Sequence, residues 1–126
     1  MKVLIAEYTA SRDPSLAPEG KAMVSVLQES FERLGHTVLL PGSGDFDAEI
    51  ARLAPQCDYG LVIAPDVLLS KFTHTLELAT HNIGSDSTAI AVCANKRLTA
   101  KVLAGIGISV PQEVPADYPG RRVIKP

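Results

Sequence analysis

Two acidic side chains and a tyrosine follow apolar segments at positions that a small molecule could reach. Glu7 and Tyr8 come directly after the run KVLIA, and Asp66 follows Pro65 after the run YGLVIA. If both runs are parallel strands, these side chains lie at the carboxyl edge of one sheet, where open α/β sheets bind ligands. A carboxylate there suits an amine or a hydroxyl group. Glu7 is therefore either a substrate-binding residue or a solvated loop acid, and Asp66 either contacts the ligand or caps its loop.

Other polar groups match the common binding motifs less well. The first turn has no glycine, so the G-x-G-x-x-G turn of dinucleotide-binding proteins is absent. The GSG at 42–44 lacks the Lys-Ser/Thr of a P-loop, which favours a turn over a phosphate cradle. His74 and His81 are seven residues apart, about two helical turns, which is too far for two imidazoles to share a metal. His36 adds no partner, so no metal site is predicted.

Apolar runs and helical stripes alternate along the chain. Residues 2–6, 37–40 and 59–64 are short apolar runs, typical of strands in a buried parallel sheet. Between them apolar residues recur at helical spacing. These residues are Met23, Val26, Leu27, Phe31 and Leu34, then Ile50 and Leu53, then Leu69, Phe72, Leu76 and Ala79. Strands that alternate with helices predict an α/β fold, a small doubly wound parallel sheet with helices on both faces.

The element ends have recognisable signals. Gly35 is placed to end the first long helix, and Asp47 to cap the helix that carries Ile50. Residues 87–93 fit a strand by periodicity, but Ser85 and Asp86 are good helix N-caps, so both assignments stay open here.

A further helix is predicted over 95–106. Its apolar residues, expected to face inward, are Leu98, Val102, Leu103 and Ile106. Lys96, Arg97 and Lys101 lie opposite, and such a cluster is more typical of a solvated helix face than of a phosphate site. Gly105 and Gly107 are expected to end this helix.

Composition narrows the class of protein. The 126 residues suffice for one domain, with 46% apolar and 5% aromatic residues, so the core must be aliphatic. A net charge of −2 argues against nucleic acid as a partner. No apolar run is long enough to predict a membrane span or a signal peptide. Cys57 and Cys93 have no motif spacing, which is typical of thiols in a reducing cytoplasm.

The segment from Asn95 to Pro111, with the pattern NK…LT…L…GI.VP followed by VIKP at 123–126, resembles a junction in ATP-grasp ligases. There a helix leaves the Rossmann-like N-terminal domain and the Lys of the next strand contacts ATP. The resemblance implies an α/β domain over 1–108, and a linker and first strand of an ATP-grasp lobe over 109–126. It implies that Lys125, and as a second candidate Lys96, contact ATP. It also favours a helix over 87–93 and a short last strand near Ile83.

A finer resemblance links the front of the chain to the archaeal group that includes tyramine–L-glutamate ligase of methanofuran biosynthesis. Its motifs are Glu-Tyr at 7–8, E-G-x-A-M at 19–23 and I-A-P-acid at 63–66. One departure is Asn95, where many relatives have Asp. The resemblance implies the substrate-side domain of an ATP- and Mg²⁺-dependent carboxylate–amine ligase that works through an acyl phosphate. Glu7, Tyr8 and Asp66 would face the substrates, and most ATP and Mg²⁺ ligands would lie beyond Pro126.

Two other classes remain as alternatives. A receiver-like signalling domain has a similar fold, and here Asp66 would be phosphorylated, with Thr88 and Lys125 as its hydroxyl and lysine residues. Against it, only one acid, Glu7, ends the first strand, where a metal-binding receiver needs two. A non-catalytic interaction domain and a homodimer also stay open.

Overall fold

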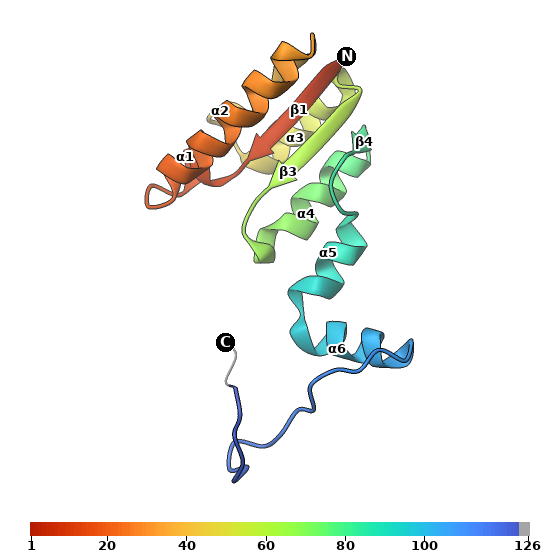
Figure 1. The fold of residues 1–126 in the computed structure, drawn as a ribbon. Coiled ribbons are helices and arrows are strands. Elements are labelled where there is room, and N and C mark those ends of the chain that lie inside the picture. The colour runs from red at the N-terminus through yellow and green to blue at the C-terminus, as the bar shows by residue number, and fades with distance from the viewer. Residues whose placement is uncertain (124–126) are drawn as a thin grey trace.

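The computed structural model describes residues 1–123, which form a four-stranded, all-parallel sheet in the order β2-β1-β3-β4 (Figure 1). The strands are β1 (Lys2–Glu7), β2 (Thr37–Leu39), β3 (Tyr59–Ile63) and β4 (His81–Asn82). In the central pairing Ile5 lies opposite Leu61, and β1 is buried at every position from Val3 to Glu7. The predicted parallel α/β sheet is confirmed, and its last strand is the short one expected near Ile83.

Helices cover both faces of the sheet, as predicted. They are α1 (Thr9–Arg12), α2 (Ala17–Arg33), α3 (Phe46–Leu53), α4 (Asp66–Glu77), α5 (Ser87–Ala94) and α6 (Lys96–Gly105), with a 3₁₀ turn η1 (Ala54–Gln56) after α3. The chain moves from β1 to β2 in one direction and then through β3 to β4 in the other. Right-handed crossovers therefore put α2 on one face and α3 with α4 on the opposite face (Figure 1).

The main core lies between the sheet and the α3–α4 layer. Side chains alternate along β1, so Leu4 and Ala6 point into this core. Leu76 of α4 is fully buried and packs over Gly60 of β3, where a Cβ would meet its Cδ1 atom and lie 3.1 Å from Cδ2. The other buried members of this core are Phe46, Ile50, Leu53, Ala54, Val62 and Phe72. Close approach of α4 to β3 thus depends on the missing side chain at Gly60.

The sheet-facing row of α2 differs from the predicted one. The buried or half-buried residues of this helix include Gly20, Leu27 and Phe31. Met23, Val26 and Leu34 were predicted to face the sheet but are 41%, 65% and 72% exposed, so that prediction is wrong. The physical reason is the close approach at Gly20, which turns its own row toward the sheet and leaves those three side chains on the flank.

The inward stripe predicted for α6 is also wrong. Leu98, Val102 and Ile106 are 41%, 47% and 69% exposed, and no residue of α6 is buried. Helix α6 follows α5 and lies away from the sheet (Figure 1), so its apolar face has no sheet to cover. Gly107 ends the helix with φ +81°, whereas Gly105 is an ordinary helical residue.

The helix boundaries follow their local signals with one exception. Asp45, not the predicted Asp47, caps α3 by accepting a hydrogen bond from the Ala48 N–H at 2.9 Å. Asp86 caps α5, so 87–93 is helical, and Gly35 ends α2 with φ +80°. Within residues 1–123, no helix combines the length and apolar character needed to cross a membrane.

Candidate functional site

The carboxyl edge of the sheet brings together Glu7, the last residue of β1, with the segments 8–12, 40–45 and 64–66, which follow β1, β2 and β3. The Tyr8 N–H donates to the Ile63 carbonyl oxygen at 2.8 Å, which joins the ends of β1 and β3. Glu7, Tyr8 and Asp66 therefore follow neighbouring strand ends, as the sequence predicts. This carboxyl edge is the candidate site.

The Glu7 carboxylate is buried at this edge, with the residue only 4% exposed. Its Oε1 atom accepts hydrogen bonds from the N–H of Thr9 at 3.0 Å and from the Thr9 hydroxyl at 2.6 Å. Its Oε2 atom accepts one from the N–H of Ala10 at 2.5 Å. A carboxylate held in this way fixes the turn from β1 into α1.

Helix α2 closes over the same carboxylate through Gly20. A Cβ at position 20 would lie 2.5 Å from Thr9 Oγ1 and 2.6 Å from the Ala10 nitrogen, and would also meet Glu7 Oε2. The geometry gives Glu7 a positioning function, because it shapes the turn that carries Tyr8 and α1. Direct contact between Glu7 and a substrate stays a prediction.

Tyr8 belongs to an aromatic cluster, with Phe46 and Phe72, that lies beneath the carboxyl edge. Its ring stacks on Phe72, with centroids 5.7 Å apart and an interplanar angle of 25°, and meets Phe46 edge-on at 5.3 Å. Phe46 and Phe72 make a T-shaped contact at 4.9 Å. Such packing holds a half-buried tyrosine in one orientation. A substrate contact by Tyr8 remains a prediction.

Arg12 is a member of this site that the sequence interpretation did not include. The α1 turn puts it four residues after Tyr8, and its guanidinium lies over the Phe46 ring, 5.5 Å from the centroid. Its Nη2 atom donates to the carbonyl oxygens of Gly42, at 3.0 Å, and Gly44. The Tyr-x-x-x-Arg spacing, one helical turn, could have indicated that the two side chains lie on one face. Residues 8–12 were interpreted only as part of a polar loop.

Glu49 holds the same loop from the other side. Its Oε2 atom accepts a hydrogen bond from the Gly42 N–H at 2.7 Å and pairs with Arg52 Nη2 at 2.7 Å. The hydrogen bond from Arg52, followed by the one from the Gly42 N–H, lowers the pKa of Glu49 to about 2. Glu49 is therefore ionised at neutral pH, and the 42–44 loop is fixed by two charged side chains.

A second charged pair lies beside the aromatic cluster. Asp47 pairs with Lys71 Nζ at 2.9 Å and accepts a hydrogen bond from the Thr75 hydroxyl at 2.6 Å. Burial alone would raise the pKa of Asp47, but the hydrogen bonds from Thr75 and Lys71 outweigh it and hold that pKa below its usual value. Asp66 is the exposed first residue of α4, so it is accessible for ligand contact, and its carboxylate makes no hydrogen bond or ion pair within residues 1–123.

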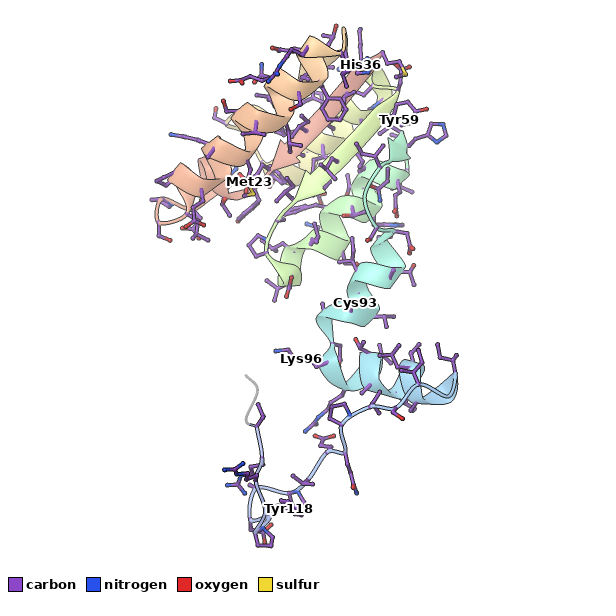
Figure 2. All side chains as sticks on the ribbon, in the orientation of Figure 1. Met23, His36, Tyr59, Cys93, Lys96 and Tyr118 are labelled. Carbon is purple, nitrogen blue, oxygen red and sulfur yellow. The ribbon has the colours of Figure 1, made fainter. Side chains whose placement is uncertain are left out.

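The remaining predicted residues lie elsewhere or outside the described chain. Lys96 begins α6, apart from the sheet (Figure 2), and Lys125 lies outside residues 1–123. Thr88 is exposed on α5 and does not follow a strand end, unlike the hydroxyl residue that the receiver alternative requires. The described residues contain no group of three or more His, Cys, Asp or Glu side chains that could hold a metal ion.

The parallel α/β fold of this chain also occurs in a solved structure. No protein-family model matches the chain, and no curated protein matches it. A solved structure does: a protein from Archaeoglobus fulgidus, provisionally classed in the ATP-grasp superfamily, with a TM-score of 0.72 and 28% sequence identity. The match covers 89% of this chain and 42% of that protein, so the chain spans less than half of its length. The chain is thus similar in fold and sequence to one part of an ATP-grasp superfamily protein.

Proposed function

We propose that this chain is the N-terminal, substrate-side domain of an ATP-grasp carboxylate–amine ligase. The observation that carries the proposal is the similarity to the Archaeoglobus fulgidus protein over 89% of the chain. Support also comes from the end of α6, where the left-handed Gly107 is followed by Val110 and Pro111 as in the ATP-grasp junction. On this proposal residues 1–108 are the α/β domain, and 109–126 lead into the ATP-grasp lobe.

The proposed reaction has two steps. A carboxylate oxygen of one substrate attacks the γ-phosphorus of ATP, ADP leaves, and an acyl phosphate forms. The amine nitrogen of the second substrate then attacks the acyl carbon, phosphate leaves, and the amine loses a proton. This domain contributes the surface that orients the small molecules, because Glu7, Tyr8 and Asp66 lie together at its carboxyl edge. Within it, Glu7 fixes the turn that carries Tyr8, and Asp66 is an exposed acid at the neighbouring strand end.

A finer assignment, to the archaeal tyramine–L-glutamate ligase-like group of methanofuran biosynthesis, is part of the proposal. Its support is the contact between two of the motifs. Glu7 of the Glu-Tyr motif packs against Gly20 of the E-G-x-A-M motif, and a larger residue at 20 would clash with it. These motifs therefore act as one structural unit. The free thiols Cys57 and Cys93 are consistent with a reducing cytoplasm as the place of the reaction.

The test is an activity measurement on the protein together with the sequence that follows position 126 in its gene. We expect ADP release that requires both a carboxylate and an amine, and we expect hydroxylamine to trap the acyl phosphate as a hydroxamate. Lys125→Met should weaken ATP binding by roughly 1.5–3 kcal/mol if one charged hydrogen bond is lost, with little effect on amine binding.

Two results would contradict the proposal. One is ATP hydrolysis that does not respond to any carboxylate and yields no hydroxamate. The other is stoichiometric labelling of Asp66 by a small phosphodonor with Mg²⁺, which would favour the receiver-like alternative. Unchanged kinetics for every substrate in Glu7→Ala would confine Glu7 to a purely structural role.

A further inference from the structure

The loop at 42–44 is held at the carboxyl edge in an arrangement that its sequence alone does not favour. Gly-Ser-Gly is among the most flexible of tripeptides, and glycine loses the most conformational entropy on ordering. Here Arg12, from the segment after β1, binds the carbonyl oxygens of Gly42 and Gly44. Glu49, from α3, binds the N–H of Gly42. Two charged side chains from different elements thus pre-organise a loop that contributes nothing to the core.

The contact with Arg12 also changes the chemistry of the loop. The carbonyl of Gly42 and the N–H of Ser43 are the two ends of one peptide group. When a guanidinium binds the carbonyl, the peptide is polarised and its N–H becomes a stronger donor. Ser43 is exposed, and within residues 1–123 neither its N–H nor its hydroxyl donates to another residue. The loop therefore offers a polarised N–H and a hydroxyl group at the carboxyl edge.

Two of the acids near this loop are paired with cations, and a third caps a helix. Glu49 is paired with Arg52 at 2.7 Å and Asp47 with Lys71 at 2.9 Å. Asp45 is engaged as the cap of α3. The Arg12 guanidinium donates to neutral carbonyl oxygens and to the Ser11 hydroxyl, and its charge also helps to lower the pKa of Glu49.

We infer that Ser43, backed by Arg12, binds a carboxylate group of a small-molecule substrate at the carboxyl edge of the sheet. The Ser43 N–H and hydroxyl donate to the carboxylate oxygens, and Arg12 is the positioning residue that holds and polarises the loop. Arg12 also supplies the positive charge behind it. This inference rests on the proposed function, because it names the part of the domain that meets the carboxylate-bearing substrate.

The test uses the chain by itself, without ATP, and glutarate as the probe. Titration with glutarate, followed through backbone amide NMR signals, should shift the Ser43 amide in a saturable manner. Arg12→Ala should weaken the apparent affinity at least ten-fold, and Arg12→Lys should weaken it less, since the ammonium keeps the charge and has donors for both carbonyl oxygens but lacks the planar guanidinium. Arg33→Ala, which removes an equal charge from the far end of α2, should change it less than two-fold. Ser43→Ala should weaken it through loss of the hydroxyl while the amide shift persists.

Thermal unfolding and the other amide signals establish that each variant is folded. The inference is overturned if glutarate shifts only signals of α6, or if Arg12→Ala and Arg33→Ala reduce affinity equally. This inference and the proposed function can fail independently of each other. Saturable binding at Ser43 in a protein that performs no ligation would reject the ligase proposal and leave this site standing. Ligation with an unperturbed Ser43 would do the reverse.

Discussion

Replacing Gly20 by alanine should destabilise the protein, although the same change in a solvent-exposed helix usually stabilises it. Alanine at an open helical position gains about 0.5–1 kcal/mol over glycine. At position 20 the new Cβ would lie 2.5 Å from Thr9 Oγ1 and 2.6 Å from the backbone nitrogen of Ala10. The Ala10 nitrogen belongs to the fixed turn and cannot rotate away, so α2 must move off β1 or the Glu7 hydrogen bonds must break.

The magnitude follows from these two routes. Overpacking of a well-packed site costs about 1–3 kcal/mol, and the loss of a hydrogen bond to a charged group costs about 1.5–3 kcal/mol. After subtraction of the helical gain, Gly20→Ala should lower the free energy of unfolding by about 1–2 kcal/mol. The assay is urea unfolding followed by circular dichroism, with the slope compared between variants.

Two further variants make this prediction specific. Gly105→Ala is the matched control, because a Cβ at that helical position has nothing within 4 Å and should not destabilise. In a double-mutant cycle with Glu7→Ala, the effect of Gly20→Ala should shrink by at least about 0.5 kcal/mol, because one of the clashing groups is gone. If Gly20→Ala stabilised the chain as an ordinary helical substitution does, the close packing of α2 on the Glu7 turn would be refuted.

Three further predictions concern the core, a charge pair and a helix end. Leu76→Ala should cost about 2–5 kcal/mol in thermal or urea unfolding because the side chain is fully buried, whereas Leu78→Ala, at a position 74% exposed, should stay within about 0.5 kcal/mol. The folded-state pKa of Glu49 is about 2, below its usual 4.5, so its stabilisation is present above pH 4.5 and lost as the pH falls toward 2. Glu49→Gln should remove that part of the pH dependence of unfolding, and retention of the full dependence would contradict it; Glu29→Gln serves as the control. Gly35→Ala should destabilise by about 1–2 kcal/mol, because φ is +80° there, and a stabilising effect would contradict the left-handed assignment.

Local chemistry allowed much of the fold to be predicted. Residues 3–6 and 59–64 carry short apolar runs, which are typical of strands buried on both faces, and they lie in and beside β1 and β3. Gly35 and Asp86 act within one helical turn, so their capping functions needed no knowledge of distant residues. The position of Glu7, Tyr8 and Asp66 after strand ends followed in the same way from the parallel order.

The failed predictions of buried helix faces depended on which partner an apolar face meets. Met23 and Val26 have the right spacing for burial, but the close approach of α2 at Gly20 selects another row of the helix. Leu98 and Val102 have an amphipathic pattern too, yet α6 lies away from the sheet. Periodicity shows that a helix has an apolar face and does not show what covers it.

By itself, the sequence determined most of the secondary elements, the parallel α/β class and the strand ends that form the carboxyl edge, because each depends on propensities and periodicities within a few residues. Only the tertiary structure decided which side chains meet at the carboxyl edge. There the Glu7 carboxylate is buried under Gly20, and Arg12 lies over Phe46. The Gly42 carbonyl accepts a hydrogen bond from Arg12, and the Gly42 N–H donates to Glu49. These contacts join residues up to 34 positions apart, from Arg12 to Phe46. Contacts at such separations depend on how the elements pack, and no local pattern in the sequence encodes that packing.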